Sequence, residues 1–164
     1  MKDPRDDGHR LRLITAAEAR LRQADDRDAV IAVVRDAART IFACDGVTFV
    51  LREGDHCHYV EEDAISPLWK GQRFKMSACI SGWAMDHCQT AVIEDVFADP
   101  RIPHDVYRRT FVKSLVMTPT SGDSPAAAIG AYWAERRSFT DTDIATVKTL
   151  GFLVGGALKG LLTP

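Results

Sequence analysis

The chain has 164 residues, of which 46% are hydrophobic and 27% are charged, and its formal net charge is -2. This length and composition are those of one globular domain that buries a core without disulfides or a structural metal. The near-neutral charge, with no stripe of lysine and arginine, excludes a general attraction to nucleic acid. The charged residues 1–12 and the glycine-interrupted apolar stretch at 150–162 fit neither a secretory signal nor a membrane span. We therefore expect a cytoplasmic protein without membrane insertion.

Two helices are predicted before the first strand. Residues 1–8 are polar and are expected to be disordered or frayed, so a single folded domain would cover residues 9–162. Apolar residues in steps of three and four predict a helix over 9–23 and a second helix after Asp25 or Asp26, either of which can be its N-cap. The buried face of the second helix is expected to comprise Val30, Val33, Val34, Ala37, Ala38 and Ile41.

Short strands follow the second helix. Residues 47–52 and 56–61 are predicted to pair as a hairpin around Glu53-Gly54-Asp55, because the second segment alternates and the linker is a turn sequence. A loop at 63–70 then leads to a third strand at 73–76.

Helical connections are predicted in the middle of the chain. Residues 80–87 are expected to form a helix capped by Ser77 or Ser81, followed by a fourth strand at 90–93. Asp99-Pro100 has the pattern of an N-cap with proline at the first helical position, so a further helix is predicted there that continues over 106–111.

Two more strands, at 115–118 and 127–134, and a final helix from Thr140 or Asp141 to about Leu162 complete the prediction. The order of elements indicates an α+β domain with a six-stranded antiparallel sheet. The last helix carries an apolar heptad stripe, which comprises Ile144, Val147, Gly151, Val154, Leu158 and Leu161.

Four segments of the chain carry a recognisable pattern. They are ISGWA at 80–84 leading to AVIEDV at 91–96, ADPRIP at 98–103, FVKSLVMTP at 111–119 and IGAYWA at 129–134. In this order they resemble the core of the GAF domain family over roughly residues 20–160. In addition, PLWKGQRF at 67–74 is similar to GAF domains found upstream of bacterial sensor histidine kinases of the HWE group.

The resemblance implies a sheet with the terminal helices packed on one face and helix–loop segments over a pocket on the other. GAF domains bind cyclic nucleotides, bilins, haem or small metabolites, and some bind nothing, so the cofactor stays unknown. Covalent bilin is disfavoured because Cys57-His58 lies in a predicted strand rather than in a helical segment near the pocket. A cyclic nucleotide is disfavoured because the asparagine-lysine-phenylalanine-aspartate-glutamate set of those members is missing.

Ten residues are candidates for ligand binding. Trp69, Trp83, Tyr107 and Phe111 come from segments that line the family pocket, and Phe74 is a further large aromatic residue of this part of the chain. Ordinary core packing is the favoured alternative for each of them. Arg101 or His104 could anchor an anionic ligand; the alternative is that Asp99 is an N-cap and that Asp95 pairs with Arg101. The candidates are Trp69, Phe74, Trp83, Asp95, Asp99, Arg101, His104, Tyr107, Phe111 and Ser114.

The four cysteines do not have the spacing of a zinc site, and Cys44 and Cys79 are expected in the core. No metal is predicted, because ligands from two separate segments would have to meet; those residues are His56, Cys57, His58, His87 and Cys88. Cys79 and Cys88 flank the predicted helix at 80–87. Because some GAF proteins reduce free methionine sulfoxide with cysteines around the pocket, such a reductase is the enzymatic alternative.

The resemblance and the heptad stripe together indicate a regulatory module without catalytic residues of its own. We expect a sensory domain of a bacterial two-component system that forms a homodimer through its terminal helices. It would act on an output kinase domain in cis or in trans when a ligand favours one arrangement of those helices. The alternative is a structural dimerisation domain whose pocket is filled by its own side chains.

Overall fold

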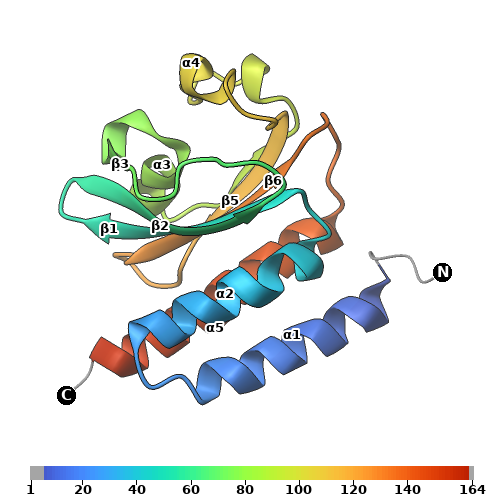
Figure 1. Ribbon diagram of the computed structural model, residues 1–164, viewed down its shortest axis with the longest axis vertical. Coiled ribbons are helices and arrows are strands. Elements are labelled where there is room, and N and C mark those ends of the chain that lie inside the picture. The colour runs from blue at the N-terminus through green and yellow to red at the C-terminus, as the bar shows by residue number, and fades with distance from the viewer. Residues whose placement is uncertain (1–5, 163–164) are drawn as a thin grey trace.

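The computed structural model describes residues 6–162, and its helices lie on both faces of one sheet (Figure 1). One face is covered by three long helices and the other by two short helices and two 3-10 turns. The helices are α1 (Asp7–Arg22), α2 (Arg27–Phe42), α3 (Ile80–His87), α4 (His104–Tyr107) and α5 (Asp141–Leu162), and the 3-10 turns are η1 (Met76–Ala78) and η2 (Val96–Ala98).

The sheet has six strands in the order β3-β2-β1-β6-β5-β4, and every neighbouring pair is antiparallel. The strands are β1 (Gly46–Glu53), β2 (His56–Ala64), β3 (Arg73–Lys75), β4 (Ala91–Ile93), β5 (Ser114–Pro119) and β6 (Ala127–Trp133). The predicted α+β class and the six-stranded antiparallel sheet are therefore confirmed.

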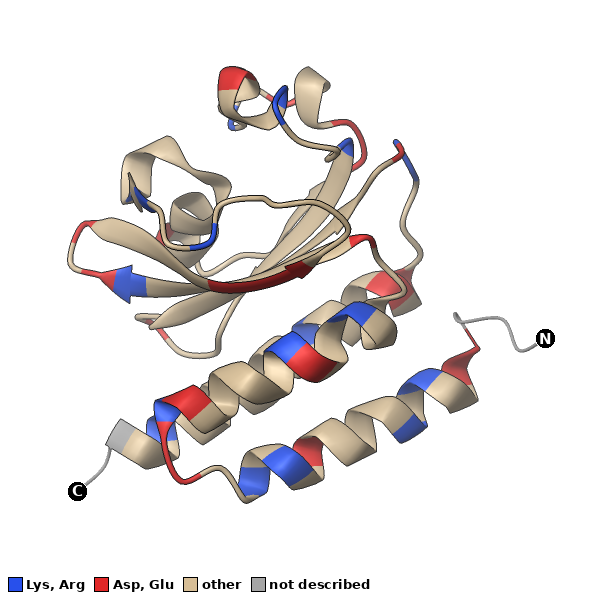
Figure 2. Cartoon of the chain, in the orientation of Figure 1, with Lys and Arg blue, Asp and Glu red and all other residues tan. Residues whose placement is uncertain are grey.

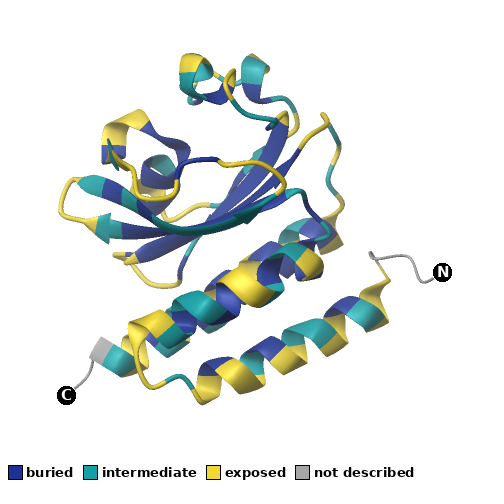
Figure 3. Ribbon diagram, in the orientation of Figure 1, coloured by how far each residue is buried: buried dark blue, intermediate teal, exposed yellow. Residues whose placement is uncertain are grey.

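Two apolar cores lie on the two faces of the sheet, because successive side chains of a strand point to opposite sides. On β6, Ile129 and Trp133 face the long helices, whereas Tyr132 faces α3 and α4. Figure 3 shows the sheet as the most deeply buried layer. The predicted face of α2 is buried, except that Ala37 is half-buried. The strand register thus decides which side chains are available on the α3/α4 face.

The three long helices form two layers. Helices α2 and α5 pack on the sheet, and α1 packs on these two helices from outside (Figure 1). On the heptad stripe of α5, Val147, Gly151, Val154 and Leu158 are buried. Charged residues lie mainly on the outer helix surfaces and the loops, with an acidic run on β2 (Figure 2). Both signs are interspersed there.

Among the described residues, the segment Asp141–Leu161 is long and apolar enough to cross a membrane by length and composition. Core packing explains its apolar character as well, since Leu150 and Val154 are completely buried against the body of the domain. Helix length and composition alone are weak evidence for a span.

Several predicted boundaries were wrong. Helix α1 begins at Asp7, after the N-cap Asp6, whose carboxylate accepts the Gly8 N–H at 2.8 Å; residues 1–5 of the predicted frayed end lie outside the described residues. Strand β2 continues to Ala64 because it stays paired with β1 as far as Gly46. The N-cap position of α3 is held by Cys79 rather than by a serine.

The predicted helix after Asp99 was the largest error. Helix α4 begins at His104, has Pro103 as its N-cap residue and ends at Tyr107, so residues 108–111 are not helical. The carboxylate of Asp99 accepts the backbone N–H of Arg101, as an N-cap does, and also binds its guanidinium. The chain makes one turn, closed by the hydrogen bond from the Ile102 N–H to the Asp99 carbonyl. An α-helix cannot continue from it because Pro103 has no N–H to donate to that carbonyl.

Candidate ligand-binding site

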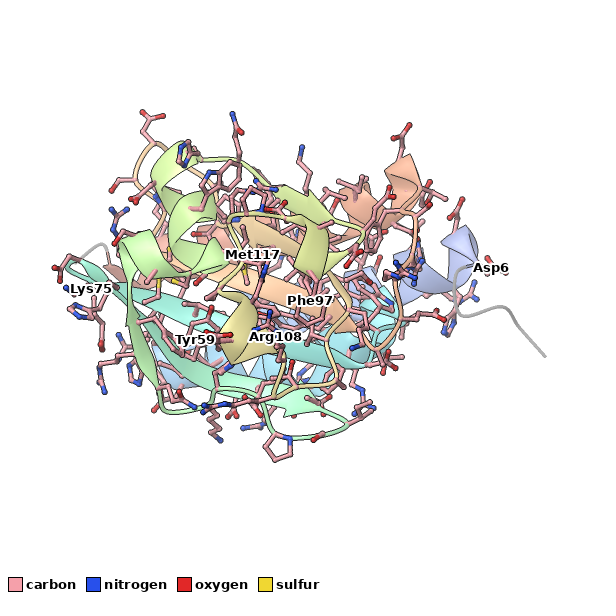
Figure 4. All side chains as sticks on the ribbon, turned by 90° about the horizontal axis from the view of Figure 1, so that it is seen from above. Asp6, Tyr59, Lys75, Phe97, Arg108 and Met117 are labelled. Carbon is pink, nitrogen blue, oxygen red and sulfur yellow. The ribbon has the colours of Figure 1, made fainter. Side chains whose placement is uncertain are left out.

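Five aromatic rings gather between the sheet and the α3/α4 layer. They form what we call the aromatic cluster: Tyr59 of β2, Trp69 of the β2–β3 loop, Phe74 of β3, Tyr107 of α4 and Tyr132 of β6. The centroid of the Trp69 ring lies 4.9 Å from that of Tyr107, 5.6 Å from Tyr132 and 5.7 Å from Tyr59. In the view onto this face, the labelled Lys75 lies at the edge of the molecule and Tyr59 lies inward of it (Figure 4). Segments far apart in the sequence therefore meet at Trp69.

The rings leave almost no free volume. A space of about 10 Å³ lies among the cluster, Cys79 and Val106, which is about what one water molecule needs. A surface groove of about 270 Å³ lies beside it, between the β2–β3 loop and α4, and Trp69, Phe74 and Val106 line both spaces. These three side chains form the partition between the groove and the interior.

The carboxylate of Glu62 holds the loop that carries Trp69. Its two oxygens accept the backbone N–H groups of Leu68, Trp69 and Lys70 at 2.9, 2.9 and 2.8 Å. Hydrogen bonds to a charged acceptor are among the stronger ones in proteins. The position of the Trp69 ring therefore depends on one acidic side chain at the end of β2.

Two of the three tyrosine hydroxyls of the cluster, those of Tyr59 and Tyr132, have hydrogen-bond partners. Tyr59 Oη lies 2.9 Å from Ser81 Oγ, and Tyr132 Oη lies 2.9 Å from Thr48 Oγ1. Burial raises the pKa of Tyr59, Tyr107 and Tyr132 above the usual tyrosine value. All three are therefore neutral hydroxyls at physiological pH and can act as hydrogen-bond donors or acceptors.

A second, polar group of predicted residues lies beside α3. The guanidinium of Arg101 binds both carboxylate oxygens of Asp99, at 3.0 and 2.7 Å, and lies 4.3 Å from the centre of the Trp83 ring. Trp83 in turn stacks on His87, and His104 Nε2 is 2.9 Å from the Asp99 carbonyl oxygen. Hydrogen bonding with Arg101 holds the pKa of Asp99 below its ordinary value. These side chains bind one another and do not line the small space in the aromatic cluster.

The remaining predicted residues have structural contacts. Asp95 caps η2 through the Phe97 N–H and pairs with Arg136 at 3.5 Å, not with Arg101. Phe111 packs beside Gly46 at the end of the sheet, and Ser114 donates a 2.7 Å hydrogen bond to the Glu135 carbonyl. The structure thus brings Trp69, Phe74 and Tyr107 together and places the other seven candidates elsewhere.

The cysteines considered for catalysis lie apart. Cys79 and Cys88 flank α3 at opposite ends, and an eight-residue helix spans about 12 Å. Cys44 and Cys79 are buried as expected, Cys57 is buried too, and Cys88 is exposed. His56 and His58 pair with acidic side chains near the surface, on the opposite side of β2 from Cys57. In residues 6–162 no group of three or more His, Cys, Asp or Glu is arranged to hold a metal ion.

Sequence reasoning missed Tyr59, Tyr132 and Glu62. The alternation along β2 and β6 could have indicated that the two tyrosines share a face with Val50 and Ala128. For Glu62 no comparable signal exists, because its three partners lie six to eight residues away in an irregular loop.

A six-stranded antiparallel sheet, with terminal helices on one face and an aromatic-lined site under helix–loop segments on the other, defines the class of this α+β domain. The family model described as GAF domain matches residues 24–159. The chain belongs to the GAF domain family.

Solved structures with the same fold come from proteins of different roles. The free methionine-R-sulfoxide reductase from Neisseria meningitidis, in complex with its substrate, has a TM-score of 0.80 at 17% identity and covers 98% of this chain and 93% of its own. The GAF domain of an Acinetobacter phosphoenolpyruvate-protein phosphotransferase has a TM-score of 0.78 at 10% sequence identity. The match covers 98% of this chain and 96% of that domain. Residues 122 to 287 of a methyl-accepting chemotaxis protein have a TM-score of 0.73 at 20% sequence identity. The match covers 88% of this chain and 96% of that fragment. No curated protein matches the sequence. At these identities the similarity shows the fold.

Proposed function

We propose that this GAF domain is a cytoplasmic sensory module of a bacterial two-component system, and that it binds a small molecule at the aromatic cluster. The observation that carries the proposal is Trp69, a large ring on an irregular loop that separates a surface groove from the interior. One carboxylate, that of Glu62, accepts three backbone N–H groups of this loop. Release of that loop would join the two spaces.

The chemistry of the cluster favours a planar, mainly apolar ligand. Aromatic walls provide large contact areas, and a few convergent polar groups orient the bound molecule. Tyr59, Tyr107 and Tyr132 supply neutral hydroxyls on three different elements. A ligand that replaces the Trp69 ring would shift the domain only by the difference in its affinity for the open and closed states.

The similar folds support a signalling role. Of the similar structures described above, one belongs to a phosphotransferase and one to a chemotaxis protein. We propose that the domain passes its signal to an output kinase domain, in cis or in trans. The HWE-type histidine kinase group remains the candidate context because of the segment at 67–74.

The terminal helices are the proposed route of the signal. On α5, Phe152 is 68% exposed, and on α1, Leu11 is 64% exposed. A groove of about 420 Å³ lies between the two helices, lined by Glu18, Leu21, Arg22, Ala24, Leu153, Gly156, Ala157, Gly160 and Leu161. We propose that a second copy of the chain covers this surface as a homodimer. Sedimentation over micromolar concentrations should show a dimer that Phe152→Glu dissociates, and a monomeric wild type contradicts the dimer.

A ligand screen by thermal shift and native mass spectrometry tests the binding site. A ligand should raise the melting temperature of the wild type and should lose affinity in Tyr107→Ala, because that ring packs directly on Trp69. Trp83→Phe is the matched control, since Trp83 lies outside the cluster, and it should bind normally. Trp69→Ala would leave a cavity of the size of an indole ring. If this variant binds indole while the wild type binds no compound, the aromatic rings only fill the core and the proposed sensing function is wrong.

The proposal includes no catalytic activity. The Neisseria protein is a methionine sulfoxide reductase, but here Cys79 and Cys88 lie at opposite ends of α3. The wild type should not reduce free methionine sulfoxide in the presence of a thiol reductant. Activity that disappears in both Cys79→Ser and Cys88→Ser would contradict this and would assign the reductase function.

A further inference from the structure

Three sulfur-bearing side chains meet at the start of α3, beside the aromatic cluster. We call Cys57 of β2, Met76 of η1 and Cys79 the sulfur cluster. Cys57 Sγ lies 3.2 Å from Met76 Sδ, and the thiols of Cys57 and Cys79 are close enough that each shifts the pKa of the other. Cys79 Sγ lies 3.5 Å from the Lys75 carbonyl oxygen and 3.3 Å from Ser81 Oγ. Ser81 Oγ in turn lies 2.9 Å from the hydroxyl of Tyr59, which lies on the same face of β2 as Cys57. The two cysteines are 22 positions apart in the sequence, so the fold alone brings them together.

Close packing of η1 on α3 makes this meeting possible. Any Cβ at Gly82 would overlap the Met76 backbone carbonyl, so only glycine permits the approach. The same packing places Cys79 at the N-cap of α3. At this position the free N–H groups of the first helical turn stabilise negative charge.

The two thiols differ strongly in acidity. The neighbouring Cys57 thiol lowers the pKa of Cys79 to about 6, against the opposing effect of burial, and the Ser81 hydroxyl and the N–H groups of Gly82 and Ser81 lower it further. The neighbouring Cys79 thiol and then burial raise the pKa of Cys57 well above that of an ordinary thiol. Cys79 is therefore the more acidic thiol of the pair.

Access to the pair also differs between its members. Cys57 is completely buried, whereas Cys79 is 8% exposed and borders the small space among the aromatic cluster, together with Ala78 and Pro103. A small oxidant that enters this space reaches Cys79 first. By contrast, burial raises the pKa of Cys44 to about 12, so Cys44 stays an inert thiol.

We propose that Cys57 and Cys79 are a peroxide-sensitive dithiol, in which Cys79 is oxidised first and Cys57 then closes a disulfide between β2 and the start of α3. No disulfide joins Cys57, Cys79 or the other two cysteines, so both thiols of the pair are available for this reaction. The modification does not depend on the proposed ligand. It would add oxidation as an input at the same wall of the aromatic cluster, because Ser81 bonds both Cys79 and Tyr59.

The oxidation proceeds in two balanced steps. The Cys79 thiolate attacks the O–O bond of a hydroperoxide: an S–O bond forms, the O–O bond breaks, and the leaving alkoxide or hydroxide takes a proton from solvent. Cys57 sulfur then attacks the Cys79 sulfenic acid: the S–S bond forms, the S–OH bond breaks, and the departing hydroxide takes the Cys57 proton as water. In sum, two thiols and one hydroperoxide give a disulfide, an alcohol or water, and a further water.

Peptide mapping of the wild-type chain tests the proposal. The reduced protein is treated with one equivalent of hydrogen peroxide, alkylated after denaturation and digested for mass spectrometry. We expect a peptide pair linked by Cys57 and Cys79 that has lost two hydrogens, with Cys44 and Cys88 alkylated. If Cys57 and Cys79 are instead both recovered alkylated, or if the disulfide involves Cys88 or Cys44, the proposal is overturned.

Two variants and a control resolve the order of the steps. Cys57→Ser should accumulate a sulfenic acid on Cys79 that dimedone traps, and Cys79→Ser should leave Cys57 unoxidised under the same treatment. The matched control Cys88→Ser, at the exposed far end of α3, should form the disulfide as the wild type does. Trapping on Cys57 in the Cys79→Ser variant would reverse the assigned roles. If a buried serine prevents either variant from folding, the peptide map of the wild-type chain still tests whether the Cys57–Cys79 disulfide forms.

Discussion

Arg10 of α1 and Asp143 of α5 form a buried ion pair: Arg10 Nη2 lies 2.8 Å from Asp143 Oδ1, and the two side chains are 5% and 8% exposed. Asp143 also accepts the Thr140 N–H at 3.0 Å and pairs with Arg137 at 3.3 Å, while Thr140 Oγ1 accepts the Asp143 N–H. This reciprocal arrangement caps α5. The outermost helix is thus tied to the beginning of the helix that we propose to carry the signal.

Asp143→Ala should destabilise the domain by about 3 kcal/mol, because removal of one partner leaves buried charge without compensation. Urea unfolding followed by circular dichroism measures this change. The control is Asp36→Ala at the exposed Arg20–Asp36 pair, for which we expect a change below about 1 kcal/mol. If the two substitutions change the free energy of unfolding equally, burial of the Arg10–Asp143 pair does not increase its contribution to stability.

The same carboxylate should make stability depend on pH in the acid range. Burial alone would raise the pKa of Asp143, but hydrogen bonds from Thr140 and Arg10 outweigh it and lower the pKa below the ordinary 3.8. Since the folded state binds the proton more weakly, this contribution is complete above the unfolded pKa and is lost as pH falls through the folded pKa. Between pH 5 and pH 2, the free energy of unfolding of Asp143→Asn should therefore fall less steeply than that of the wild type. Parallel curves would contradict the assignment.

Glu62→Gln should loosen the loop that carries Trp69. The substitution removes the negative charge that accepts three backbone N–H groups, and a weakening of about 2 kcal/mol corresponds to roughly 30-fold faster amide exchange. Hydrogen exchange at Leu68, Trp69 and Lys70 measures it. Glu61→Gln is the control, because Glu61 pairs with the exposed Lys70 side chain; similar acceleration in both variants would exclude a specific role of Glu62.

Gly82→Ala should cost about 3 kcal/mol or more, since the added methyl group meets the Met76 backbone and not a flexible side chain. The matched control is Gly156→Ala in α5, where a Cβ has no neighbour within 4 Å in the same chain; because Gly156 lines the groove of the proposed dimer, both substitutions are made in the Phe152→Glu background. That change should stabilise the helix by about 0.5–1 kcal/mol. Chemical denaturation of both variants checks the opposite signs, and a neutral Gly82→Ala would show that η1 moves away from α3 at little cost.

Local pattern was sufficient for most of the elements. The apolar spacing of α2, the hairpin of β1 and β2, and the start of α5 at Thr140–Asp141 follow from residues close together in sequence, and the structure confirms them. The antiparallel sheet followed from the order of these elements and from the resemblance. The helix predicted after Asp99 failed because Pro103, four residues later, has no N–H to donate to the Asp99 carbonyl.

The site shows the limit of the sequence more clearly. Trp69, Phe74 and Tyr107 were candidates by family resemblance, but their meeting with Tyr59 and Tyr132 depends on strand register. The sequence by itself determined the periodicities and the turns, because these arise from interactions between near neighbours. The order of the elements and the resemblance indicated the sheet class. The tertiary structure decided that Glu62 holds the Trp69 loop, that Arg10 reaches Asp143, and that Cys57 rather than Cys88 meets Cys79. Those contacts join residues whose separation in the chain carries no local signal, so only the packed fold creates them.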